Sequence, residues 1–257
     1  MVPQSRSVIR VALLVCGTPI PPVAEAFGGY PVIFRQLLQQ GLDELKSQDR
    51  INQDVELILE GFDVREDSYP EDLHDWDAIM ISGSASNAYD DISWINKLVE
   101  YVQKLHKEGE GLKMVGICFG HQIIGRAFGA KVSKSPDGWE LGWTSTDLTK
   151  EGQAFWKGTV MRIQELHQDF VHSIPDGFTL LATSPHTTNQ SMVSNDHRIV
   201  SIQGHPEFTG PIMKEFIKFR TANGTFSKEL SEASMKVIDN PLDSVKVAAQ
   251  ILQFIFA

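Results

Sequence analysis

The chain has 257 residues, of which 42% are hydrophobic and 22% are charged, the balance of an ordinary globular protein. Its formal net charge is −10 and it has no dense basic run, which argues against nucleic acid and anionic membranes as partners. It also lacks the roughly 18 continuous apolar residues of a membrane span. Its two cysteines, Cys16 and Cys118, form no disulfide framework, which favours a reducing compartment and predicts a cytoplasmic protein.

The first half of the chain alternates apolar runs with segments of helical spacing. Four apolar runs predict strands, at residues 11–17, 54–64, 77–84 and 113–118. Three segments with helical spacing predict helices, at residues 32–42, 91–109 and 120–130. Asp91 is the candidate N-cap of the second helix, and a Pro/Gly-rich loop is expected at residues 18–31. This alternation of strands and helices predicts a parallel sheet with helices on both faces.

The pattern changes after Ala130 to short strands and turns, which continue to about Ser201 and predict a small antiparallel insertion. The end of the chain is helical again, at residues 210–224 and 241–257, and five apolar residues are expected to dock the last helix: Ile251, Leu252, Phe254, Ile255 and Phe256. No internal repeat or flexible linker divides the chain. We therefore predict one α/β domain over residues 1–257, an open, mostly parallel, flavodoxin-like sheet with a C-terminal helical extension from about residue 220.

Residues 116–120 place Cys118 between two glycines, where a predicted strand meets a predicted helix. This pattern is typical of a nucleophile elbow, a sharp turn that exposes the side chain at its centre. Glycine on each side lets the strand and the helix approach closely without a Cβ clash. The helix N-terminus would favour the thiolate of Cys118, and the N–H of Phe119 would point at a developing oxyanion. The alternative is an inert, buried cysteine in a tight turn.

A thiol nucleophile needs a base, and His205 in the stretch Gln-Gly-His-Pro-Glu-Phe is the candidate. If His205 ends a strand, Glu207 lies on the same face two residues later and can orient the imidazole. Cys118, His205 and Glu207 would then be nucleophile, base and orienting acid. A backbone N–H of Gly83 or Ser84, where a predicted strand ends, is the candidate second oxyanion donor. The alternatives are a polar loop around His205 and a plain Gly-Ser turn.

Together these segments resemble the class I, triad-type glutamine amidotransferases. Residues 116–122 resemble the cysteine elbow of that family, residues 204–207 resemble its His-x-Glu element, and residues 81–84 stand where the family has Ser-Gly-Gly-Pro. The resemblance covers most of the chain, and the motifs keep the order of the family. Ser84 and Ala85 replace the usual Gly-Pro of the oxyanion loop, a change that a backbone donor tolerates.

The resemblance implies that Cys118 attacks the γ-amide carbon of a glutaminyl group. Ammonia or an amine leaves, and a γ-glutamyl thioester remains. His205 takes the thiol proton, returns a proton to the leaving nitrogen and then activates the water that releases glutamate. Four further residues match family positions at the substrate pocket, with a structural role as the alternative for each: Gln122, Glu140, His167 and Asp169.

The resemblance leaves two enzymatic alternatives open. About forty residues follow Phe219, too few for a synthase, and no P-loop or other nucleotide-binding signature occurs. The chain is then either a stand-alone γ-glutamyl hydrolase, similar to the plant γ-glutamyl peptidases, or a glutaminase subunit that delivers ammonia to a separate synthase. We expect the stand-alone hydrolase, acting without a cofactor on a small γ-glutamyl substrate.

Three other functions are weighed against this hypothesis. The same fold without catalysis would be a binding module, although the three catalytic candidates are all present. An α/β-hydrolase is disfavoured because its acid precedes its histidine in the chain, whereas Glu207 follows His205. His167 and His172, without a cysteine pair or a His-Glu helix motif, do not predict a metal site. The sequence makes no prediction of the oligomeric state.

Overall fold

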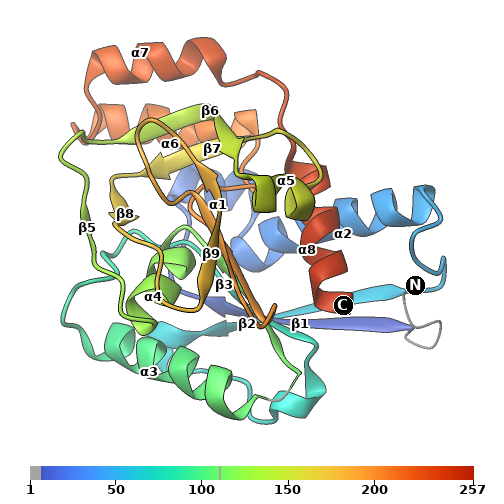
Figure 1. Ribbon diagram of the computed structural model, residues 1–257. Coiled ribbons are helices and arrows are strands. Elements are labelled where there is room, and N and C mark those ends of the chain that lie inside the picture. The colour runs from blue at the N-terminus through green and yellow to red at the C-terminus, as the bar shows by residue number, and fades with distance from the viewer. Residues whose placement is uncertain (1–6, 110) are drawn as a thin grey trace.

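The computed structural model describes residues 7–109 and 111–257, and within these residues the centre is a nine-stranded sheet (Figure 1). The strands, in the order in which they lie in the sheet, are β2 (Glu56–Asp63), β1 (Val8–Val15), β3 (Ala78–Ile81), β4 (Lys113–Ile117), β11 (Ile199–Ile202), β10 (Ser191–Ser194), β9 (Phe178–Thr183), β6 (Glu140–Leu148) and β7 (Val160–His167). A separate antiparallel pair joins β5 (Val132–Lys134) to β8 (Asp169–Val171).

Strands β2, β1, β3, β4 and β11 pair in parallel, and the side chains of the four inner strands are largely buried on both faces of the sheet, whereas the edge strand β2 is mostly exposed or half-buried. In β1, Val11 and Leu13 belong to the core on one face, whereas Ala12 and Leu14 belong to the core on the other. All four are fully buried, so the strand reads as a continuous apolar run rather than as an alternating one. The predicted fold class, an α/β sheet with parallel strands between layers of helices, is confirmed.

Helices cover both faces of the sheet (Figure 1). They are α1 (Pro21–Phe27), α2 (Tyr30–Ser47), α3 (Ser93–Glu108), α4 (Phe119–Ala127), α5 (Lys150–Trp156), α6 (Gly210–Ala222), α7 (Lys228–Val237) and α8 (Ser244–Phe256). Short 3-10 helices cover Val64–Glu66 and Leu73–Asp75. Buried residues of α3 and α4 form the core on one face, and those of α2, α6 and α8 form the core on the other. In the part of the chain that the structure describes, no helix combines the length and the apolarity that a membrane crossing requires.

The last helix, α8, packs closely against α2 at Gly41 (Figure 1). A Cβ atom at Gly41 would lie 2.7 Å from the Cβ atom of Ala248, so a side chain there would push the two helices apart. Small residues at a helix crossing allow such an approach. The expected docking of the last helix is confirmed, although Phe256 is only half-buried while the other four predicted residues are buried.

The structure differs from the expectations in three places. The antiparallel strands β10, β9, β6 and β7 do not form a small insertion but extend the same sheet beyond β11. Helix α1 lies inside the expected Pro/Gly-rich loop, with proline in its first turn, where the missing N–H leaves no hydrogen bond unmade. Asp91 is not the N-cap of α3: Ile92 holds that position, and the Asp91 carboxylate accepts a hydrogen bond from the Asn96 side chain at 2.7 Å.

The carboxyl ends of three neighbouring parallel strands meet at one edge of the sheet. Ile81 at the end of β3 is in register with Gly116 of β4, and Ile117 is in register with Ile202 at the end of β11. The chain segments that follow these strands therefore emerge side by side. Ligand sites of open α/β sheets form at such an edge.

Candidate active site

Cys118 stands in the sharp turn between β4 and α4, with φ of 52° and ψ of −102°. Its N–H donates to the carbonyl of Ile202 at 2.8 Å, which ties the turn to the end of β11. A positive φ in a residue with a side chain is strained by about 1–3 kcal/mol, and such strain gathers at functional sites. A Cβ at Gly116 would lie 2.7 Å from the backbone of Gly120, and one at Gly120 would overlap the Ile81 carbonyl. The close packing of α4 on the sheet therefore requires both glycines.

His205 lies in the loop three residues after β11 and is held there by contacts on several sides. Its N–H donates to the Gln164 carbonyl on β7 at 2.8 Å. Its Nδ1 donates to Glu207 Oε1 at 2.7 Å, and its ring stacks on Phe208 with the centroids 4.2 Å apart. The expected contact between His205 and Glu207 is present, but it forms in a turn and not on a strand. Nδ1 is thus occupied, and the second ring nitrogen, Nε2, is left for another partner.

Cys118 is the candidate partner, because its Cβ atom and the His205 ring both border Gly83 and its sulfur acts electrostatically on the imidazole. Burial alone would lower the pKa of His205, but the carboxylate of Glu207 and the sulfur of Cys118 outweigh it and raise this pKa to about 10. Gly83 completes the contact, because a Cβ there would lie 3.0 Å from His205 Cε1 and 3.8 Å from Cys118 Cβ. Four of the predicted site residues therefore meet at one point.

Cys118 opens into a cavity of about 140 Å³. The predicted residues Ser84, Gln122, His167 and Asp169 also line this cavity. Further lining residues, which were not among the predicted site residues, are Ala85, Ser86, Asn87, Lys134, Trp139, Leu166, Gln168 and Arg220. The cavity thus places one carboxylate and two cationic side chains within reach of the thiol.

Arg220 reaches the cavity from α6 through a cage of aromatic rings. Its guanidinium carbon lies 5.3 Å from the ring centre of Trp139, 5.7 Å from that of Phe226 and 5.8 Å from that of Phe216. Cation–π contacts of this kind fix the position of a guanidinium while leaving its N–H groups free to bind an anion. A single arginine in an amphipathic helix carries no motif, so its role at the cavity could not be predicted from the sequence.

The loop after β3 has a defined peptide orientation. Ser82 Oγ accepts the N–H of Cys16 at 2.9 Å and donates to the Gly83 carbonyl at 3.1 Å. Because a trans peptide directs its C=O and N–H to opposite sides, the N–H of Ser84 points away from Ser82. Among residues 7–109 and 111–257, neither the N–H of Ser84 nor that of Phe119 donates to a protein acceptor.

Gln122 and Asp169 form one wall of the cavity. Gln122 Nε2 donates to the backbone carbonyl of Asp169 at 2.9 Å and to Gln203 Oε1 at 3.2 Å. This amide group therefore joins the helix that follows Cys118 to the segment that carries Asp169. Burial raises the pKa of the Asp169 carboxyl, and Tyr89 contacts it at 3.5 Å.

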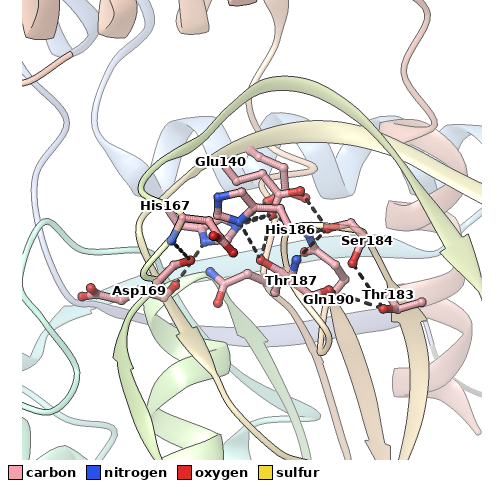
Figure 2. A network of polar contacts seen from close by, with 12 residues as sticks. Glu140, His167, Asp169, Thr183, Ser184, His186, Thr187 and Gln190 are labelled. Carbon is pink, nitrogen blue, oxygen red and sulfur yellow. Dashed lines mark hydrogen bonds and ion pairs between the residues drawn. The ribbon is translucent and has the colours of Figure 1, made fainter. Parts of the chain in front are cut away.

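Glu140, unlike the other three residues predicted at the substrate pocket, does not line the cavity. It points at the loop between β9 and β10, where Oε1 accepts from Ser184 Oγ and Oε2 accepts from Thr187 Oγ1 and Gln190 Nε2, each at 2.9 Å (Figure 2). These donors come from a loop that lies more than forty residues further along the chain, and they set the orientation of the Glu140 carboxylate.

His167 connects Glu140 to a second buried acid, Glu165. Its Nε2 lies 3.1 Å from Glu165 Oε2. The same nitrogen lies 3.1 Å from Glu140 Oε2, and Nδ1 lies 3.1 Å from the backbone carbonyl of Asp169 (Figure 2). Burial alone would lower the pKa of His167, but the two carboxylates raise it to about 10. The imidazolium lowers the pKa of Glu140 against the effect of burial, whereas burial raises the pKa of Glu165 to about 7.

Glu140, Glu165 and His167 also have the composition of a possible metal site. Within residues 7–109 and 111–257, they are the one group of three or more His, Cys, Asp or Glu residues whose potential ligand atoms all lie within 4.8 Å of one another. The 3.1 Å contacts of His167 with both carboxylates, and the three side-chain donors on Glu140, account for this arrangement as an ion-pair cluster. We therefore assign the three residues to the protein's internal polar network, and not to the binding of a metal.

Comparison with known proteins bears on this site. The family model of class I glutamine amidotransferases matches residues 46–222. The chain belongs to that family. A glutamine amidotransferase-like protein of Schizosaccharomyces pombe is 30% identical to this amidotransferase chain over 250 residues, which are 96% of the chain and 98% of that protein. γ-Glutamyl peptidase 5 of Arabidopsis thaliana is 34% identical over 216 residues, covering 81% and 79%.

The fold of the amidotransferase chain has solved counterparts. A crystal structure of a glutamine amidotransferase from Thermotoga maritima matches it with a TM-score of 0.68 at 17% identity, covering 97% of this chain and 99% of that one. At this identity the match concerns the fold alone. The family predicted from the cysteine elbow and the His-Pro-Glu segment is confirmed.

Proposed function

We propose that this amidotransferase hydrolyses a γ-glutamyl amide bond, with Cys118 as nucleophile, His205 as general acid and base, and Glu207 as the residue that orients the imidazole. The proximity of Cys118, across Gly83, to a His205 ring that Glu207 holds at 2.7 Å carries this proposal. A thiol next to an oriented imidazole, with its own cavity, is the arrangement that acyl transfer through a thioester needs.

In the proposed reaction His205 holds the proton of Cys118 as an imidazolium, in keeping with its raised pKa, and the thiolate attacks the γ-carbonyl carbon. The carbonyl oxygen becomes an oxyanion, for which the N–H groups of Phe119 and Ser84 are the proposed donors. The C–N bond breaks as His205 returns its proton to the leaving nitrogen, and a γ-glutamyl thioester remains. Water, deprotonated by His205, attacks the thioester, and the C–S bond breaks to give glutamate and the thiol.

Charges around the cavity support a substrate with two carboxylates. Asp169 is placed to meet the α-ammonium group of a γ-glutamyl residue, and Lys134 and Arg220 are placed to meet carboxylates. Free glutamine has one carboxylate, whereas a γ-glutamyl peptide has a second one beyond the scissile bond. The two cationic residues therefore favour γ-glutamyl peptides over glutamine as substrates.

The test is the release of glutamate by the purified chain from three compounds: glutamine, a γ-glutamyl dipeptide and its C-terminal amide. We expect turnover without a partner protein, with the dipeptide as the best substrate, and loss of turnover in Cys118→Ala. Equal activity of Cys118→Ala and the wild type would refute the assigned nucleophile. Turnover that appears only with an added synthase would identify a glutaminase subunit instead, and binding without turnover under either condition would identify a binding module.

A further inference from the structure

Glu165 is a buried acid without the hydrogen bonds that such a group normally has. Its side chain is completely buried, and in the part of the chain that the structure describes neither of its carboxyl oxygens accepts a hydrogen bond of normal geometry. Its nearest cation is His167, whose Nε2 lies 3.1 Å from Oε2. Buried polar groups are satisfied in the great majority of cases, so an exception calls for an explanation. A hydrophobic side chain would fill the same space at a lower free energy.

The carboxyl group of Glu165 lies directly against the backbone that carries His205. A Cβ atom at Gly204 would be 2.5 Å from Glu165 Oε1, so Gly204 leaves just enough room for the carboxyl group. The residue before Glu165 on β7, Gln164, accepts the N–H of His205 at 2.8 Å. Strand β7 thus holds the His205 loop by its backbone and places an acid next to it.

The charges around Glu165 do not cancel. On its own strand, the imidazolium of His167 is matched by the carboxylate of Glu140 on β6, which also accepts three neutral donors. Glu165 is therefore the surplus negative charge of the cluster when it is ionised. The remaining charged group that faces it is His205, in the loop after β11.

Two more histidines lie around the cluster. Burial lowers the pKa of His121, on α4, to about 3, which keeps this residue neutral. His186, in the loop after β9, approaches Glu140 and not Glu165, with its Nδ1 3.6 Å from Glu140 Oε2. Because burial raises the pKa of Glu165 to about 7, the surplus charge appears near neutral pH.

We propose that Glu165 is a positioning residue for His205: its carboxyl group supports the Gly204–His205 peptide, and its negative charge stabilises the His205 imidazolium and, with it, the Cys118 thiolate. This inference rests on the proposed pairing of Cys118 with His205, but it does not depend on which substrate the chain hydrolyses. A residue that only filled space would affect folding without affecting the ionisation of the thiol.

The test follows the rate of alkylation of Cys118 by iodoacetamide between pH 5 and 9, with the modified cysteine located by peptide mass mapping. Alkylation reports the thiolate directly and needs no substrate, so it separates this inference from the proposed hydrolysis. Cys16 does not compete, because burial raises its pKa to about 12. Glu165→Gln removes the charge with nearly the same shape, and Glu232→Gln, at an exposed site on α7, is the matched control.

We expect a wild-type profile with an additional rise near pH 7 that is absent in Glu165→Gln and present in Glu232→Gln. Between pH 7 and 8 the wild-type rate should exceed that of Glu165→Gln by about threefold to fivefold, the effect of a pKa change of about one unit while the thiol is only partly ionised, and the two rates should converge towards pH 9. His167→Gln removes the cation that lowers the pKa of Glu165 and should move the rise to higher pH. The proposal is overturned by a wild-type profile without the rise, or by the same rise in a folded Glu165→Gln.

Discussion

Substituting Gly83 by alanine tests whether the contact between Cys118 and His205 is as close as the structure has it. The φ angle of Gly83 lies outside the left-handed region, so its backbone accepts alanine without strain. The new Cβ atom would lie 3.0 Å from His205 Cε1, whereas carbon atoms in contact prefer about 3.5–4.0 Å. The imidazole must therefore retreat from Gly83 by about 0.5–1 Å.

The size of the effect follows from this displacement. A misplacement of about 1 Å at a reacting group costs on the order of a hundredfold in rate, so we expect kcat/KM to fall by about tenfold to a hundredfold. The transition-state stabilisation lost is then about 1.4–2.7 kcal/mol. The melting temperature should change little, because the imidazole can shift without opening a cavity.

The assay is glutamate release from a γ-glutamyl dipeptide, together with the melting temperature. The matched control is Gly17→Ala in the adjacent loop, where the new Cβ atom would lie 3.5 Å from Ser84, an ordinary contact distance. We expect this control to keep its kcat/KM within about twofold, because a contact at van der Waals distance displaces nothing. Equal activity of Gly83→Ala and Gly17→Ala would refute the assigned geometry around His205.

Three further predictions concern the charged groups. Glu207→Gln should destabilise the protein most below about pH 6.5, and the difference in the free energy of unfolding from the wild type should shrink as pH rises through about 10, because the raised pKa of His205 gives stability that is lost when the imidazolium deprotonates. Urea unfolding at pH 6 and pH 10 measures this difference. A difference that grows with pH would contradict the prediction. Glu140→Gln leaves His167 paired with Glu165 but removes the charged acceptor of three side-chain donors, and it should lower the free energy of unfolding by about 1–3 kcal/mol, where no loss would count against the cluster. Arg220→Ala should raise KM for a γ-glutamyl dipeptide by about tenfold and leave KM for glutamine within about twofold, with Arg220→Lys in between. Equal rises for both substrates would assign Arg220 to the α-carboxylate that they share, and no rise for either would remove Arg220 from the proposed substrate contacts.

The placement of Cys118, His205 and Glu207 could be predicted because each position follows from a local rule. Two glycines around a cysteine at a strand end predict the turn, and parallel strands place their carboxyl ends at one edge of the sheet. His205 and Glu207 are only two residues apart in the sequence, so they contact each other as predicted, although the contact forms in a turn and not on a strand.

Residues whose environment is built by distant segments could not be placed from sequence. Glu140 belongs to an element that resembles a family motif, yet its orientation is set by donors such as Ser184 and Gln190 in a loop far along the chain. Arg220 depends on how α6 packs under Trp139 and Phe226, which no periodicity reveals. Tertiary packing decides both positions.

The extent of the antiparallel strands was missed for a related reason. Strands β10 and β11 are short and joined by a tight turn, and their sequence does not indicate whether they begin a separate sheet or extend the first one. That choice depends on hydrogen bonds at the edge of β4, which pairs with β11 in parallel. Which distant segments pair through backbone hydrogen bonds is only weakly indicated by the pattern of side chains in the sequence.

The central claim is that Cys118 carries the γ-glutamyl group during turnover. The direct measurement is acid quenching of the enzyme with a γ-glutamyl dipeptide, followed by mass spectrometry of the intact chain and of its peptides. The proposed reaction predicts an adduct with the mass of one γ-glutamyl group on the peptide that contains Cys118, and no adduct and no turnover in Cys118→Ala. An adduct on another residue, or undiminished turnover by Cys118→Ala, would contradict it.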